Sequence, residues 1–373
     1  MKRLNKFLCS VLTGFFCLFC LYGCEQIGLA IKAAEIHEKI LTVDTHADTP
    51  FLMGIFKDYD PGQYHDPQTA SLQIDFPRMK KGGLDAIFFI AFVFQGARDA
   101  AGNLAAKDKA LSKIALVHQA LDDNPDLAEL ALTPADAYNI EKVGKRAIFL
   151  GMENGYPIGT DLSLIQNFYD LGVRYITLCH TSNNDICDSS TDPKGAEHNG
   201  LSAFGEHVVA EMNRLGIMVD VSHVSDDTVL DVLELSSAPV IASHSCARAV
   251  YAHPRNLPDD LIAAIAEKGG TVQVTLYSDY VKASDPENSE QLPTVSDFVD
   301  HIDHIVYVAG IDYVGIGSDF DGGAMLSDCR EVSQVGNITL ELVKRGYTET
   351  EIENIWGGNL MRVFSEVKEA VQL

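Results

Sequence analysis

Seven acidic and histidine side chains stand where apolar stretches of the chain end. They are His46 and Asp48 after the first stretch, then Glu153, His180, His223, His244 and Asp319 after five others. One such residue is usually structural, because it hydrogen-bonds the backbone or caps the next helix. Seven in the same relative position indicate a shared role. Imidazole and carboxylate are the usual zinc ligands where thiolates are absent, and zinc with an open position ionises bound water near neutral pH.

The spacing of these residues favours two metal ions. His46 and Asp48 lie two positions apart, so in an extended strand their side chains face the same side. His223 and His244 supply a second pair. Glu153 lies between the pairs in sequence and can offer one oxygen to each of two ions held about 3.5 to 4 Å apart. We therefore expect Glu153 to bridge two ions, and three histidines favour zinc over magnesium.

Asp319 is a candidate acid/base. It lies in the segment Gly315-Ile-Gly-Ser-Asp-Phe-Asp-Gly322, whose spacing does not complete a phosphate-binding GxGxxG motif. We interpret its glycines as allowing close approach of the backbone to a ligand. Asp319 can take a proton from the metal-held water and deliver it to a leaving amine. Asp321 is expected to orient the loop.

Eight β-branched or aromatic runs, each followed by a helix-compatible segment, organise the chain. They cover residues 41–44, 84–92, 146–152, 173–179, 216–222, 239–243, 271–276 and 313–318. Several are apolar almost throughout, as parallel strands buried on both faces are. The alternation favours one α/β domain, a (β/α)8 TIM-type barrel, in which active sites form at the carboxyl ends of the strands. A doubly wound open sheet is the alternative.

Helix signals fill the intervals between these runs. They are a lead-in at 28–40, an N-cap at Thr133 before Pro134, an apolar stripe over 204–215 and a capping box formed by Thr348 and Glu351. The longer intervals at 93–145 and 277–312 are expected to hold enlarged loops and extra helices near the mouth of the site.

The amino terminus predicts export. Residues 1–24 start with basic residues and continue with an apolar run too short for the roughly 20 residues of a membrane span. Gly23-Cys24 resembles a bacterial lipobox, in which the cysteine is lipidated. We expect a signal peptide at 1–24, a hydrolase barrel at 25–373 and a periplasmic or cell-surface protein anchored only through Cys24. A plain signal peptide and an uncleaved anchor are the alternatives.

Composition excludes some partners and one kind of metal site. A net charge of −25 repels phosphate backbones, so nucleic acid and polyanionic substrates are not expected. Four cysteines lie beyond residue 24 and form no CxxC pair, so a thiolate zinc site is not indicated. They are Cys179, Cys187, Cys246 and Cys329. A disulfide among them is possible after export, but spacing does not reveal its pairing.

From residue 36 to residue 364 the chain resembles the membrane dipeptidase (renal dipeptidase) family of the amidohydrolase superfamily. The resemblance is carried by Val43-Asp-Thr-His46-Ala-Asp48, Gly151-Met-Glu153, Thr177-Leu-Cys-His180, Val219-Asp-Val-Ser-His223, Ala242-Ser-His244-Ser, His253-Pro-Arg255-Asn and Gly315 to Gly322. The combination of these motifs in this order is far more specific than any one of them.

The resemblance implies a distorted barrel with two zinc ions per subunit. His46 and Asp48 would bind one ion, His223 and His244 the other, and Glu153 would bridge them. Asp319 would be the acid/base, His180 would contact the peptide carbonyl and stabilise the oxyanion, Arg255 would bind the substrate's C-terminal carboxylate, and Tyr277 would line the pocket. Members of the family cleave dipeptides, tolerate a C-terminal D-residue, in some cases open β-lactam rings, and are often dimers, so a homodimer is a possible assembly.

Three positions need separate interpretation. For Arg255, a planar guanidinium can grip a carboxylate with two hydrogen bonds, and a surface salt bridge is the alternative. Ala47 and Asn154 differ from the family, which often has Asn and Gly at these positions. We expect both to line the pocket floor and to affect substrate preference.

The sequence thus predicts a zinc-dependent dipeptidase, in which a hydroxide bridging both ions attacks the peptide carbonyl. The first alternative is another amidohydrolase, such as an N-acyl-D-amino-acid deacylase or a cyclic-amide or β-lactam hydrolase. The second is a non-catalytic metal-binding surface lipoprotein, which would need no acid/base residue such as Asp319.

Overall fold

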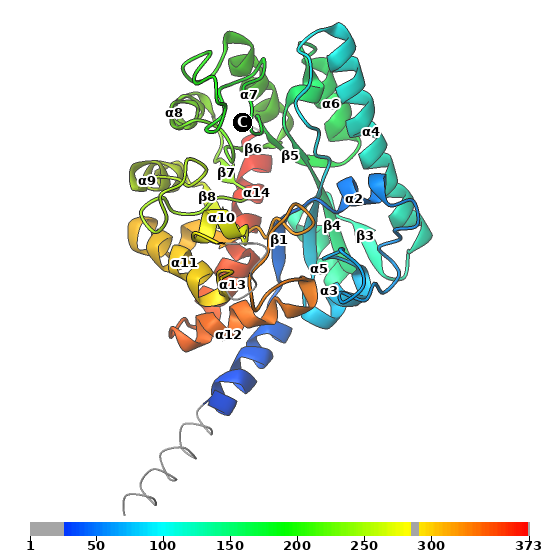
Figure 1. Ribbon diagram of the computed structural model, residues 1–373, viewed down its shortest axis with the longest axis vertical. Coiled ribbons are helices and arrows are strands. Elements are labelled where there is room, and N and C mark those ends of the chain that lie inside the picture. Colours follow the sequence, from blue (N-terminus) through cyan, green and yellow to red (C-terminus); the bar gives the residue numbers. More distant parts are fainter. Residues whose placement is uncertain (1–25, 285–290, 372–373) are drawn as a thin grey trace, which may run out of the picture.

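Parallel strands form the inner wall of the molecule. The computed structural model describes residues 26–284 and 291–371. In this part of the chain the main sheet has the order β1-β2-β4-β5-β6-β7-β8-β9 (Figure 1). These strands are β1 Val43–Ala47, β2 Ala86–Ile90, β4 Arg146–Glu153, β5 Val173–Thr177, β6 Met218–Asp220, β7 Ile241–Ala242, β8 Thr271–Val274 and β9 Val314–Ile316.

The two ends of the sheet come together and nearly close the barrel. Ala47 and Phe320 form a parallel bridge, and the Asp48 amide donates to the Phe320 carbonyl over 2.8 Å. The buried carboxylate of Asp44 in β1 also accepts the Ser318 amide at 2.7 Å. The predicted (β/α)8 barrel is therefore confirmed, and the open sheet is excluded.

The predicted runs and the observed strands overlap at all eight positions. Six of the observed strands are shorter than the predicted runs, whereas β1 and β4 are each one residue longer; β1 begins at Val43 instead of Leu41 and includes His46. The sequence analysis missed β3, Ala128–Leu130, which pairs with the first half of β4. This strand is only three residues long, so it has no measurable periodicity.

Helices surround the barrel on its outside (Figure 1). They are α2 Thr49–Ile55, α3 Phe76–Gly82, α4 Ala100–Asp123, α5 Pro134–Lys142, α6 Ser163–Asp170, α7 Ala203–Leu215, α8 Asp226–Leu235, α9 Asp259–Glu267, α10 Ser278–Val281, α11 Val295–Ala309, α12 Gly336–Lys344, α13 Glu349–Glu353 and α14 Asn359–Ala370, with short turns η1 Tyr156–Ile158, η2 Ile311–Tyr313, η3 Val332–Gln334 and η4 Asn354–Gly358. Both predicted caps are present, as full capping boxes at Thr133 and Thr348.

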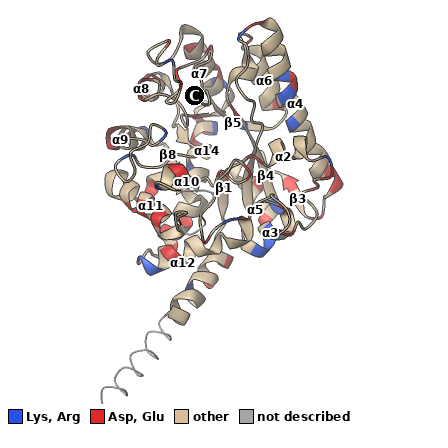
Figure 2. Ribbon diagram, in the orientation of Figure 1, with Lys and Arg blue, Asp and Glu red and all other residues tan. Residues whose placement is uncertain are grey.

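Further helix predictions are also confirmed. Residues 26–39 form the lead-in helix, which projects from one end of the barrel (Figure 1). The predicted long intervals contain α4, α10 and α11. Acidic residues are spread over the outer helices, with several on α9 and α11 (Figure 2). The negative charge of the chain is thus carried largely on its outer surface.

The barrel interior is filled with aromatic side chains below the site. Phe88 stacks on Phe149 with ring centroids 4.6 Å apart, and Tyr175 packs beside Phe88 at 5.3 Å. Phe364 of α14 packs against Phe149 from the other end. Since alternate residues of a strand share a face, Glu153 at the end of β4 points to the same interior side as Phe149.

The N-terminal and cysteine predictions have different outcomes. The predicted signal peptide at 1–24 and its Cys24 lie outside the described residues. Within the part of the chain that is described, no helix has the length and apolar character needed to cross a membrane. All four cysteines beyond residue 24 are buried and unpaired, so the structure contains no disulfide among them.

The glycine interpretation of the Asp319 segment needs correction. A methyl group on Gly317 would overlap the backbone oxygen of Ser243 and the hydroxyl of Thr45. Gly317 therefore allows close packing of the segment after β9 against the end of β7 and the middle of β1. Gly322 does line the cavity described below.

We predict that Gly317→Ala destabilises the protein. The backbone at Ser243 cannot move without disturbing the adjacent His244, and overpacking of this kind costs about 1–3 kcal/mol. Urea denaturation should show a lower midpoint. Gly28→Ala is the matched control, because Gly28 is exposed on the lead-in helix with open space around it. That change should be neutral or stabilising, by up to about 1 kcal/mol. Equal stability of both variants would contradict the prediction.

Candidate active site

The seven predicted residues gather at the carboxyl ends of the strands, as barrel geometry requires. His46 lies in β1, Glu153 ends β4, and the other five lie in the loops just after β1, β5, β6, β7 and β9. They surround a cavity of about 230 Å³. Its lining comprises Asp48, Phe51, Phe92, Phe94, Glu153, His180, Thr181, His223, His244, Tyr277, Tyr280, Asp319, Asp321 and Gly322. His46 is fully buried directly beneath.

Glu153 is the centre of the cluster. Its Oε1 lies 2.9 Å from Nε2 of His223 and 3.3 Å from Nε2 of His244. Its Oε2 lies 3.7 Å from Nε2 of His46. The two carboxylate oxygens therefore face different histidines, which is the arrangement expected of a bridging ligand. Donor atoms of His46, Asp48 and Asp319 form a further close group.

Hydrogen bonds behind two of the histidines orient their lone pairs. The Tyr175 hydroxyl donates to the Thr45 carbonyl at 3.0 Å, so it accepts from Nδ1 of His46 at 2.9 Å. Ser243 donates to Asp220 at 2.6 Å and accepts from Nδ1 of His244 at 2.8 Å. With Nδ1 protonated in both rings, each Nε2 presents a lone pair toward Glu153.

These donors fit a metal site. Nε2 of His46 and Oδ1 of Asp48 are buried and have no hydrogen-bond partner. Buried polar atoms without partners are costly, and buried carboxylates require a compensating positive charge. A set of three histidines and two carboxylates without thiolates is a donor set that divalent zinc accepts. The division of these ligands between two ions stays a prediction.

Burial sets the protonation of the candidate acid/base. It raises the pKa of Asp319 to about 7, with the charge of Glu153 acting in the same direction and the charges of His46 and Arg255 opposing it. A carboxyl group with such a pKa can both accept and release a proton near neutrality. Burial also lowers the pKa of His180, which favours the neutral imidazole. Neutral His180 can still donate one hydrogen bond to a substrate oxygen.

Arg255 is buried beside the cavity. It is 3% exposed, and within the described ranges it makes no ion pair with a carboxylate. Its Nη2 donates to the His244 carbonyl at 3.1 Å, while Nε has no partner. The alternative of a surface salt bridge is therefore wrong. Its guanidinium lies 5.2 Å from the ring of Tyr280, which stacks on Tyr277 at 4.5 Å.

The sequence analysis missed several residues of this site. Tyr280, Phe51, Phe92 and Phe94 line the cavity, and Tyr175 and Asp220 support the histidines. Only Asp220 had a visible signal, as an acid inside a predicted apolar strand. The expectation for Ala47 and Asn154 was wrong, because both are fully buried and neither lines the cavity.

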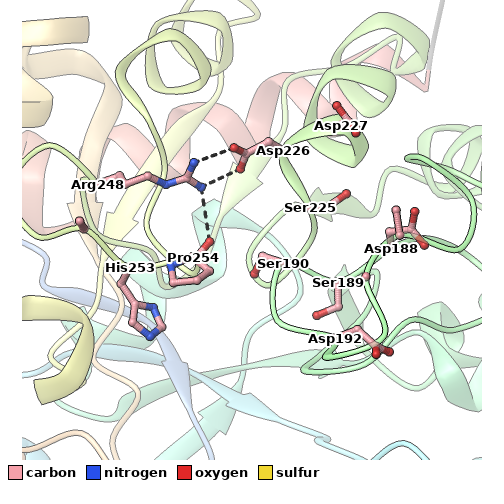
Figure 3. Close-up of a pocket in the computed structure, with 13 residues that line it drawn as sticks. Asp188, Ser189, Ser190, Asp192, Ser225, Asp226, Asp227, Arg248, His253 and Pro254 are labelled. Atoms are coloured by element: carbon pink, nitrogen blue, oxygen red, sulfur yellow. Dashed lines mark hydrogen bonds and ion pairs between the residues drawn. The ribbon is translucent and has the colours of Figure 1, made fainter.

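A second, larger cavity lies behind the loop that follows β5 (Figure 3). Several of its charged groups already have partners within the protein. Arg248 forms two 2.7 Å bonds to Asp226, and Asp188 accepts the backbone amides of residues 197, 198 and 200. None of the predicted metal ligands lines this cavity, so the chemistry belongs to the smaller one.

Comparison with known proteins agrees with this geometry. Residues 31–372 match the model of the membrane dipeptidase family, peptidase family M19. The chain belongs to the membrane dipeptidase family. It is accordingly a metal-dependent dipeptidase-type hydrolase. It is 35% identical over 349 residues to dipeptidase verJ of Clonostachys rogersoniana, covering 91% of this chain and 87% of that protein. It is 37% identical to mouse dipeptidase 3, covering 88% of this chain and 64% of that protein.

Solved structures of dipeptidases share the fold. The probable dipeptidase PvdM from Pseudomonas aeruginosa superposes with a TM-score of 0.83 at 26% identity, over 92% of this chain and 99% of that chain. A metallopeptidase from Rhodobacter sphaeroides, liganded with a phosphinate mimic of L-Ala-D-Ala, superposes with a TM-score of 0.77 at 25% identity. The match covers 88% of this chain and 99% of that chain. The family thus supports the predicted barrel over nearly the whole chain.

We predict that Tyr175→Phe weakens metal binding while the protein stays folded. The change removes the acceptor that holds Nδ1 of His46 protonated, and loss of such a supporting partner typically costs about 10–100-fold in affinity. Zinc competition with a chromogenic chelator measures this directly. Tyr307→Phe, at a residue 85% exposed, is the control and should bind zinc like the parent. Unchanged affinity in Tyr175→Phe would contradict the assigned tautomer.

Proposed function

We propose that this protein hydrolyses the peptide bond of short free dipeptides, including those with a C-terminal D-residue, with two zinc ions. The observation that carries the proposal is the convergence of three histidines on the two oxygens of buried Glu153. The dipeptidases among its relatives support the substrate class. The mimic of L-Ala-D-Ala bound to the Rhodobacter protein supports tolerance of a D-residue.

Five residues would hold the two ions. His46 lies on the Oε2 side of Glu153 with Asp48 close to it, and His223 and His244 lie on the Oε1 side. When bound, the ions supply water that ionises near neutral pH and positive charge for a developing oxyanion. Glu153 keeps the two halves of the site at a fixed separation, because each half contacts a different oxygen of one carboxylate.

The remaining polar residues would act on the substrate directly. His180 lies with Nε2 4.0 Å from Oε1 of Glu153, where it can donate to the scissile carbonyl oxygen. Asp319 lies on the opposite side of Glu153, with Oδ1 4.0 Å from Nε2 of His46. From there it accepts the proton of the attacking water and passes it to the departing amine.

Arg255 and the cavity size restrict the substrate to short free peptides. A buried guanidinium without a carboxylate partner is a ready binding site for the substrate's terminal carboxylate. Tyr277 lines the same side of the cavity. The volume of about 230 Å³ is below the roughly 300–1,000 Å³ typical of sites for drug-sized ligands.

A panel of L,L and L,D dipeptides, assayed with zinc-loaded protein, tests the proposal against its rivals. Cleavage of free dipeptides supports it. Cleavage only of N-acyl-D-amino acids, cyclic amides or β-lactams would assign the site to another amidohydrolase reaction. The non-catalytic alternative is disfavoured by membership of an enzyme family and by the presence of Asp319.

We further propose export and N-terminal lipid anchoring through Cys24, which mass spectrometry of the mature terminus would test.

We predict that Asp319→Asn abolishes turnover and leaves bound zinc at the parent level. The amide cannot accept the proton of the attacking water, whereas the five proposed ligands stay in place. Metal analysis by plasma mass spectrometry beside kcat measurement checks both parts. Loss of zinc together with activity would instead assign Asp319 a ligand role.

We predict that Arg255→Ala selectively impairs cleavage of free dipeptides. Removing one partner of a buried charge pair costs about 2–5 kcal/mol, so kcat/KM should fall by about 30-fold or more. Dipeptide amides lack the carboxylate and should lose far less. Arg248→Ala is the matched control, since Arg248 pairs with Asp226 outside the catalytic cavity. An equal loss for both substrate types would argue against carboxylate recognition.

A further inference from the structure

Three phenylalanines form one side of the catalytic cavity. Phe51 lies in α2, and Phe92 and Phe94 follow β2. Their rings contact one another edge to face, with centroids 4.6 Å apart for Phe92 and Phe94, 5.7 Å for Phe51 and Phe94, and 6.0 Å for Phe51 and Phe92. All three line the cavity, and Phe94 is 62% exposed. We call these three residues the aromatic wall.

The aromatic wall lies across the barrel mouth from Arg255. In the ring β1-β2-β4-β5-β6-β7-β8-β9, strands β2 and β7 stand opposite each other. Phe92 and Phe94 follow β2, whereas Arg255 follows β7. Glu153 and its histidines lie between the two sides. The ring of Phe92 also packs against His180, with centroids 4.6 Å apart.

This placement orients a dipeptide. If its carboxylate binds Arg255 and its scissile carbonyl lies beside His180, the C-terminal residue occupies the side of β7 and β8. The N-terminal residue must then extend past Glu153 toward the opposite side. The side chain of that residue meets Phe92 and Phe94.

The wall is held from behind by polar groups. The Lys113 ammonium on α4 donates to the Phe92 carbonyl and lies 4.9 Å from the ring centroid of Phe51. Asn154, which follows Glu153, donates from Nδ2 to the Val93 carbonyl at 3.0 Å. Such fixed groups reduce the ordering cost of binding, which is how a preformed surface gains affinity.

We infer that the aromatic wall binds the N-terminal side chain of the substrate and selects apolar, above all aromatic, residues there. The inference rests on the proposed function and names the substrate class of the same site. An exposed phenylalanine beside a small cavity gains from covering its apolar surface, and aromatic pairs gain further from edge-to-face contact. Lys113 is not among the residues that line the cavity, and its ammonium donates to the Phe92 carbonyl, so the surface that the wall presents to a substrate side chain is aromatic.

The test compares kcat/KM of the zinc-loaded full chain for Phe-Ala, Leu-Ala, Gly-Ala and Glu-Ala, with Gly-Phe as the mirrored substrate. We expect kcat/KM of the parent to be about tenfold or more higher for Phe-Ala than for Gly-Ala, because apolar pockets discriminate between side chains of different size on this scale. Phe94→Ala should lower kcat/KM for Phe-Ala about tenfold and for Gly-Ala and Gly-Phe less than about threefold. Phe51→Ala should act in the same direction. Phe56→Ala is the matched control, since Phe56 is half-exposed at the end of α2 and does not line the cavity.

Lys113 is tested as a positioning residue. Lys113→Met should raise KM for Phe-Ala with little change in kcat for Gly-Ala, and Lys113→Arg should restore the low KM. A general folding defect would lower both rates together.

Several outcomes would overturn the inference. The inference is overturned if the protein cleaves dipeptides without preferring Phe-Ala. It is also overturned if that preference survives both Phe94→Ala and Phe51→Ala. In both cases the proposed function stands. A preference for Glu-Ala that is lost in Lys113→Met would assign recognition to the lysine. Absence of cleavage of every dipeptide would overturn the proposed function and the inference together.

Discussion

The site depends on the charge of one buried carboxylate. Glu153 is 2% exposed at the end of a strand whose preceding residues pack in the barrel core. A carboxylate in such a place requires positive charge around it. Histidines from three strand ends supply donor atoms on both of its oxygens, and the unpartnered atoms of His46 and Asp48 face the same space. Metal ions would complete this arrangement, because their positive charge would satisfy all of these groups at once.

The barrel fixes the positions of the histidines and carboxylates around Glu153. Its strands run in parallel and bring residues distant in sequence to one rim. Hydrogen bonds in the layer behind then orient the ligands: Tyr175 for His46, and Asp220 through Ser243 for His244. Asp44 joins the first strand to the loop of Asp319. Buried residues of the barrel interior thus set the direction in which the Nε2 lone pairs of His46 and His244 point.

In the proposed function, substrate recognition is divided between opposite sides of the rim. Arg255 is a positive charge buried in a strongly acidic protein, whose other charges lie mainly on the outer helices (Figure 2). The aromatic wall on the other side carries no charge toward the cavity. A short peptide with a free carboxylate and an apolar first residue matches both sides. The proposed metal centre lies between these two sides.

The sequence alone determined the fold class and the metal-ligand candidates. Eight apolar runs have a clear pattern, and His46, Glu153 and His244 break such runs at the strand ends, where chemistry is expected. Only the tertiary structure decided which side chains surround them. Phe94 and Lys113 come from loops and helices without a periodic signal, and Asn154, whose backbone φ is 71°, donates to the Val93 carbonyl and does not line the cavity. Contacts of this kind depend on how separate strand ends meet across the barrel, which local sequence patterns do not encode.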